Sequence, residues 1–196
     1  MERAKLISPT HPGVLYWAGF LELLDGRTTA ACASWQQCLR FSDEYTKQIL
    51  DAAHQAFPSS AVVNDVLPMD PRILLKLATR YYGNNDQSAE RCLVLDRADV
   101  AIAQVNLPQA EQYYLRASVN RLQKAPSAAI NNYDRAIQLD PMNTKWRHEF
   151  AEILFQEGQF QQALGQATAA STLEPENRKY SRLLKKILHR LQNGTD

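Results

Sequence analysis

The chain has 196 residues, of which 45% are hydrophobic and 22% charged, which is the composition of a folded protein. Its formal net charge of +1 provides no global attraction to nucleic acid or to an anionic membrane. No apolar run approaches the roughly 20 residues that a membrane span needs, and no signal-peptide pattern follows Met1. We therefore expect a soluble protein without a membrane span, cytoplasmic or, if bacterial, periplasmic.

Residues 1–9 are similar to a segment that lies 132 positions further along the chain. Three residues recur in the same places at this offset: Arg3 with Arg135, Ala4 with Ala136 and Pro9 with Pro141. We expect residues 1–9 to be the end of a repeat unit whose upstream part is missing. The alternative is a naturally short helical stub at the N-terminus.

Residues 10–43 show the same offset and are predicted to form a pair of helices. Small and turn residues match across it: Gly19 with Ala151, Gly26 with Gly158, Ala31 with Ala163 and Cys38 with Ala170. One position disagrees, because Glu22 stands opposite the apolar Leu154. Trp35 provides a large aromatic side chain where the later copy has Ala167.

Residues 44–107 are less regular, and we interpret them as two degenerate helix pairs. Apolar residues recur at helical spacing in Glu44–Phe57 and again in Ser88–Val105. Asp70–Pro71 is a strong helix start, with an N-cap residue followed by proline at the first helical position. The short run Ala61–Val63 is a weak hint of a strand.

Residues 108–141 and 142–175 repeat each other with a period of 34 positions. Similar residues occupy matched positions: Pro141 and Pro175, Ala117 and Ala151, Ala129 and Ala163, Ala136 and Ala170, Leu139 and Leu173. Antiparallel helices that pack at ~8–10 Å need small side chains where their backbones approach, and the alanines meet that need. The proline then ends each unit because it cannot continue a helix.

The segment Trp146–Pro175 resembles a tetratricopeptide repeat, whose period is about 34 residues. Its small, turn and closing positions are Ala151, Gly158, Ala163, Ala170 and Pro175. It departs from the family where Trp146 lies one position away from the usual Trp and where Ala167 replaces a large aromatic. The resemblance implies an all-α, right-handed superhelical solenoid of antiparallel helix pairs. It also implies a scaffold that binds a protein or peptide, and not an enzyme.

Residues 176–192 form the clearest amphipathic segment, and 193–196 are predicted to be a tail. Apolar residues at helical spacing occupy one face: Tyr180, Leu183, Leu184, Ile187, Leu188 and Leu191. We interpret the segment as a capping helix whose polar outer face closes the solenoid. The alternative is that its basic face, within 178–190, contacts an anionic lipid surface or an acidic partner.

The resemblance places the ligand groove on the first helix of each pair. Partner-binding candidates are the residues there that packing does not require: Tyr16, Trp17, Phe20, Leu23, Tyr114, Ser118, Arg121, Lys145, His148, Glu149, Glu152 and Gln156. An exposed Trp17 or Phe20 would be a binding anchor, and the alternative is that both are buried against a missing upstream repeat. Some family members hold chaperone C-termini with a positive clamp, and Glu149 and Glu152 disfavour that ligand here.

The sequence contains no glycine-rich phosphate loop, nucleophile elbow or metal-binding motif of paired cysteines or histidines. Cys32, Cys38 and Cys92 are predicted to be buried small apolar residues. His148 and Glu152 are predicted to form a surface pair on one helix face. We predict no catalytic, cofactor-binding or metal-binding residues and no nucleic-acid partner.

A looser similarity links Val66–Leu75 and Tyr113–Ala117 to the soluble repeat tails of bacterial O-antigen ligase-like envelope proteins. It implies a second hypothesis, an accessory or regulatory domain of a membrane-bound glycan-handling protein. An unrecognised helical enzyme is the third hypothesis.

Overall fold

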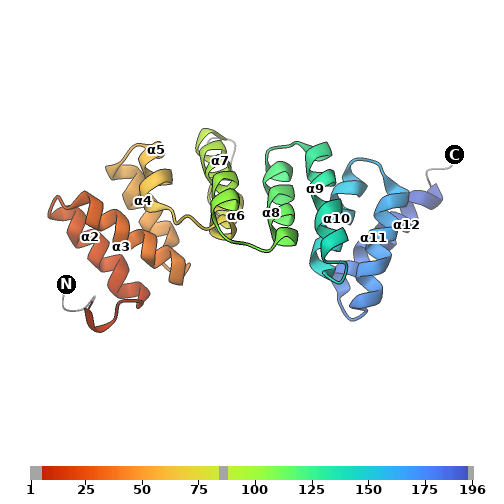
Figure 1. The fold of residues 1–196 in the computed structure, drawn as a ribbon, viewed down its shortest axis with the longest axis horizontal. Helices are drawn as coiled ribbons and strands as arrows, with labels where there is room; N and C mark the ends of the chain where they lie inside the picture. Colours follow the sequence, from red (N-terminus) through yellow and green to blue (C-terminus); the bar gives the residue numbers. More distant parts are fainter. Residues whose placement is uncertain (1–5, 84–87, 194–196) are drawn as a thin grey trace. The chain divides into compact units, whose positions relative to one another are not determined.

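The computed structural model describes residues 6–83 and 88–193, so part of the predicted segment 1–9 and part of the tail 193–196 lie outside the described residues. Eleven α-helices and one π-helical turn make up the regular structure there, with no strand in the described part of the chain (Figure 1). The predicted all-α class is confirmed. The chain divides into two compact units, Met1–Ala101 and Ile102–Asp196, which we describe separately.

The first unit consists mainly of short helices joined by short turns. Its elements are α2 (Pro12–Leu24), α3 (Thr28–Phe41), α4 (Thr46–Ala56), α5 (Ser59–Ala61), the π-helical turn η1 (Val62–Val66), α6 (Pro71–Arg80) and α7 (Ser88–Gln104), whose last residues enter the second unit. The hint of a strand in Ala61–Val63 was wrong, because these residues continue from α5 into η1. The predicted start of α6 is present: the Asp70 side chain accepts a hydrogen bond from the backbone N–H of Arg72.

In the helix pair α2–α3, a hydrogen-bonded pair of polar side chains, Glu22 and Ser34, occupies the one position that departs from the repeat pattern. Glu22 is only 3% exposed, so it occupies a buried site as its counterpart Leu154 does. The hydroxyl of Ser34 on α3 donates a 2.6 Å hydrogen bond to Glu22 Oε2. A buried carboxylate is tolerated when donors hold it, and the repeat geometry therefore survives the substitution.

The second unit is a stack of helices in which each packs on its neighbour in the sequence (Figure 1). Its elements are α8 (Gln109–Leu122), α9 (Pro126–Leu139), α10 (Thr144–Gln156), α11 (Phe160–Leu173) and α12 (Arg178–Asn193). The matched alanines Ala129, Ala151, Ala163 and Ala170 are fully buried, which is the role that the period of 34 positions predicted for them. Tyr133, Phe150 and Leu154 fill the space between the alanines.

The same turn recurs between the helices of three pairs. Its central residue has a positive φ of 74° at Gly26, 59° at Lys124 and 74° at Gly158. The N–H of the next residue closes the turn by donating to a carbonyl five residues earlier, as Gln159 does to Leu154. This is the usual glycine-containing end of a helix, in which glycine adopts the left-handed conformation without strain.

Two of the three cysteines are buried, as predicted, whereas the prediction for Cys92 was wrong. Cys32 and Cys38 lie in the core of the first unit, and Cys92 is exposed. On α7 it is Val94 and Leu95 that point into the core, which leaves Cys92 on the outer face. No helix in the described residues combines the length and apolar character needed to cross a bilayer.

Candidate partner-binding surface

Aromatic stacking fixes the first helices of the second unit, α8 and α10, against each other. The Tyr114 ring on α8 stacks on the Trp146 ring on α10 with centroids 4.8 Å apart and planes 13° apart. The Lys145 ammonium lies 5.5 Å from the Tyr114 ring centroid, a cation–π contact. Burial, followed by the nearby charge of Glu149, raises the pKa of the Tyr114 hydroxyl. Tyr114 is therefore a half-buried packing residue.

A single carboxylate links three helices of this unit. Glu149 accepts hydrogen bonds from the Tyr114 hydroxyl at 3.4 Å and from the Tyr133 hydroxyl at 3.2 Å. Tyr133 comes from α9 and is fully buried, and burial raises the pKa of its hydroxyl. Both tyrosines therefore stay protonated and remain donors at neutral pH. Glu149 therefore has a mainly structural role, because its hydrogen bonds connect α8, α9 and α10.

A second carboxylate, Glu152, joins α8 to a buried histidine. Its Oε2 lies 3.9 Å from Arg121 Nη1, and its Oε1 lies 3.2 Å from His148 Nε2, without the geometry of a hydrogen bond. The interpretation of His148 and Glu152 as a surface pair was wrong for His148, which is only 2% exposed. The ring of Tyr180 on α12 covers it, with centroids 4.8 Å apart. Burial lowers the pKa of His148, opposed in part by the charge of Glu152.

Ser118 is a further residue that the sequence placed on the free surface and the structure buries. Its hydroxyl donates to the carbonyl of Tyr114 at 3.1 Å within α8. Four predicted residues of the second unit keep accessible side chains and do not serve mainly in packing: Arg121, Lys145, Glu152 and Gln156. We call these residues the first-helix surface. Helical periodicity identifies the face of a single helix. It does not show that α12 covers His148 or that α8 and α10 share hydrogen bonds.

The predicted residues of α2 form an aromatic cluster in the first unit. Tyr16 stacks on Tyr45 with centroids 4.6 Å apart, and Trp17 meets Tyr16 edge-on at 5.1 Å. Trp17 is 52% exposed and also contacts Phe20, with ring centroids 6.2 Å apart. Leu23 is half-buried. An exposed indole ring beside further aromatic rings has the character of a binding anchor. The binding of a partner at this cluster stays a prediction.

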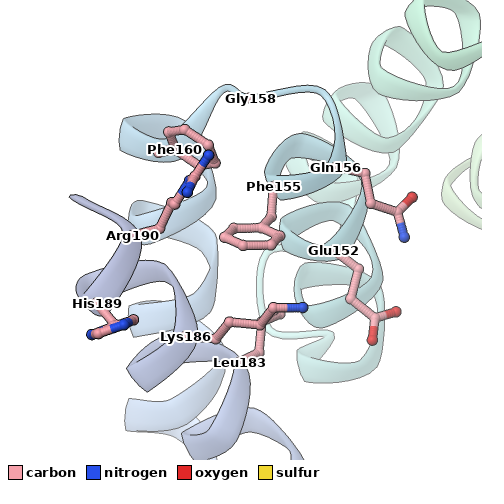
Figure 2. A pocket seen from close by; sticks show the side chains of 9 residues that line it. All are labelled: Glu152, Phe155, Gln156, Gly158, Phe160, Leu183, Lys186, His189 and Arg190. Carbon is pink, nitrogen blue, oxygen red and sulfur yellow. The ribbon is translucent and has the colours of Figure 1, made fainter. Parts of the chain in front are cut away.

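A groove that the sequence did not predict lies between the turn after α10 and the helix α12 (Figure 2). Its volume is about 580 Å³, and aromatic and basic side chains make up most of its lining. The residues that line it are Glu152, Phe155, Gln156, Gly158, Phe160, Leu183, Lys186, His189 and Arg190. The pattern of α12 showed its basic face. The position of this face opposite Phe155 and Phe160 depends on how α12 packs against α11, which only the structure shows. Glu152 and Gln156 belong both to the groove and to the first-helix surface.

Several titratable groups of the second unit lie at contacts between helices. Among the residues that the structure describes, no three His, Cys, Asp or Glu side chains lie close enough together to hold a metal ion. Tyr114, Tyr133 and His148 are among the groups whose pKa is shifted, and all three belong to the packing between helices. Pairs of antiparallel helices stacked through small residues define the class of this molecule: an α-helical repeat solenoid.

Comparison with known proteins agrees with this class. Residues 121–187 match the family model described as tetratricopeptide repeat, which confirms the resemblance for that part of the chain. A solved chain of the APC/C hetero-tetramer Cut9–Hcn1 aligns with 95% of this chain at 14% identity and a TM-score of 0.51. At that identity the likeness concerns the fold alone, and the present chain spans 38% of the length of that chain.

Two crystal structures of MamA are also similar. One aligns over 77% of this chain and 94% of its own at 19% identity, with a TM-score of 0.45. The other aligns over 92% and 88% at 16% identity, with a TM-score of 0.42. No curated protein matches the sequence. The looser similarity to O-antigen ligase-like proteins has no support among these matches.

Proposed function

We propose that this chain is a non-catalytic scaffold that binds a segment of another protein on the first-helix surface of its second unit. The proposal rests on one observation: packed and hydrogen-bonded pairs fix α8 and α10 against each other, while charged and amide side chains next to them stay accessible. The Tyr114–Trp146 stack and the hydrogen bonds to Glu149 provide the rigid part. Lys145 and Gln156, both exposed, provide part of the accessible surface.

A rigid, pre-formed surface favours binding because little side-chain entropy is lost when a partner docks. The accessible residues carry both signs of charge: Arg121 lies 3.9 Å from Glu152, and Lys145 lies on the same helix as Glu152. Such a surface suits a peptide or helix that reads several polar positions, and it provides no cluster of positive charge for a lone terminal carboxylate. This supports an internal protein segment as the ligand.

An array of short natural peptides probed with the full chain tests the proposal. We expect binding to a restricted subset of peptides, and loss of that subset in Gln156→Glu, which places a negative charge on the surface. Gln162→Glu is the matched control, because Gln162 is an exposed glutamine on α11, the second helix of the same pair. Binding to no peptide, or equal binding by both variants, would contradict the proposal.

A further inference from the structure

The groove between the α10–α11 turn and α12 has an aromatic floor. Phe155, at the end of α10, and Phe160, at the start of α11, are half-buried and tilted against each other with centroids 5.4 Å apart. Leu183 of α12 completes the apolar part of the lining. Figure 2 shows the Phe155 ring facing α12 across the groove. Such a floor accommodates an aliphatic or aromatic side chain.

Two cations of α12 lie over this floor. Lys186 Nζ is 4.9 Å from the Phe155 centroid, and Arg190 Cζ is 5.9 Å from the Phe160 centroid. Figure 2 shows Lys186 reaching toward Phe155 and Arg190 extended beside Phe160. These cation–π contacts keep the two charged groups at the groove and restrict their movement in solvent.

The charge of the groove is unbalanced. Neither Lys186 nor Arg190 has a carboxylate within 4.0 Å among residues 6–83 and 88–193. Glu152 is the only acidic residue of the lining, and its two oxygens already face Arg121 and His148. The groove therefore combines an apolar floor with two positive charges that have no carboxylate within 4.0 Å in the described part of the chain.

We propose that this groove binds an acidic peptide segment of another protein, with one apolar side chain on the phenylalanine floor and carboxylates beside Lys186 and Arg190. This inference rests on the proposed function and names the chemistry of the ligand. Charge complementarity selects an acidic segment, and the floor selects one that also carries an apolar residue. Ammonium and guanidinium groups form strong, charge-assisted hydrogen bonds with carboxylates.

The packing of α12 favours a peptide over a membrane surface. A helix that binds a bilayer inserts its apolar face. In α12 that face is already used: Ile187 is fully buried, and Leu183 and Leu191 pack against the core of the second unit. Leu188, at 40% exposure, is the one large apolar residue of α12 left on the surface.

Fluorescence anisotropy on the full chain tests this inference with a labelled synthetic peptide that has two leucines among glutamates. Two control peptides replace either the glutamates with lysines or the leucines with serines. We expect the first peptide to bind and both controls to bind at least about tenfold more weakly. Sedimentation with phosphatidylserine vesicles provides the membrane comparison. Binding to vesicles without binding to the acidic peptide would overturn the inference.

Two charge-reversed variants locate the site. Lys186→Glu/Arg190→Glu should weaken peptide binding at least about tenfold. Arg178→Glu/Arg182→Glu changes the net charge of α12 equally at exposed positions outside the groove lining and should retain most of the affinity. Circular dichroism checks that both variants are folded. Equal losses would show non-specific charge attraction and overturn the inference. Selection of neutral or basic peptides on the array would also overturn it and leave the proposed function standing.

Discussion

Gly19 on α2 lies directly against the indole ring of Trp35 on α3. A Cβ built at Gly19 would be 2.5 Å from Trp35 Cδ1 and 2.5 Å from Nε1, closer than carbon contacts in proteins allow. Trp35 is fully buried, and its Nε1 donates to the carbonyl of Tyr16, so the ring has no room to move. In the later repeat the equivalent positions hold Ala151 and Ala167, so the two helix pairs divide the same interface volume differently.

We therefore expect Gly19→Ala to destabilise the first unit. Overpacking costs about 1–3 kcal/mol, against the roughly 1 kcal/mol that alanine gains over glycine in a helix, so the net loss is up to about 2 kcal/mol. Urea denaturation of Gly19→Ala in the wild-type and Trp35→Leu backgrounds measures the coupling. The penalty should disappear when the ring is absent. An equal penalty in both backgrounds would show that the ring is not its cause.

The buried pair Glu22–Ser34 provides a second prediction. Ser34→Ala removes a donor from a buried carboxylate and should lower the free energy of unfolding by about 1–3 kcal/mol. In the double variant Glu22→Leu/Ser34→Ala the position becomes apolar, as it is at Leu154, and we expect most of the loss to be recovered. Thermal denaturation of the two variants gives the comparison. A double variant less stable than Ser34→Ala alone would contradict the equivalence of Glu22 and Leu154.

Lys124 occupies a turn position that glycine holds in two other pairs, and its φ is 59°. A non-glycine residue in this conformation is strained by roughly 1–2 kcal/mol, while glycine loses about 0.5–1 kcal/mol in chain entropy. Lys124→Gly should therefore stabilise the second unit by up to about 1.5 kcal/mol. Gln123→Gly, at an adjacent residue with φ of −79°, should destabilise it. Similar losses in both variants, measured by urea denaturation, would argue against strain at Lys124.

The buried His148 predicts a pH dependence. Its pKa is lowered from 6.5 in the folded chain, so the unfolded chain takes up the proton first as the pH falls below that value. Stability is then present above about pH 6.5 and is lost toward lower pH. Glu149, Glu152 and Lys179 are the charged groups that influence this histidine.

Melting temperatures at about pH 7.5 and about pH 5.5 check this prediction. His148→Gln should reduce the difference between the two, because its side chain does not titrate. His189→Gln, at an exposed position on α12, should leave most of it. An unchanged difference in His148→Gln would assign the pH dependence to other groups.

The sequence by itself determined the helices, the small residues at the crossings and the turns. Ala151, Ala163 and Gly158 could be recognised because packing and backbone conformation restrict each of these positions to a few residue types. That restriction repeats in the pairs α2–α3, α8–α9 and α10–α11, so the period is visible in one chain.

The tertiary structure alone decided which surface residues are free. His148, Glu149 and Glu152 share one helix, yet the first is covered by Tyr180, the second holds two tyrosine hydroxyls and the third remains partly exposed. The same holds for the groove, where Phe155 meets Lys186 only because α12 packs against α10 and α11. Periodicity encodes the face of each helix, whereas burial and charge pairing depend on side chains brought together from different helices.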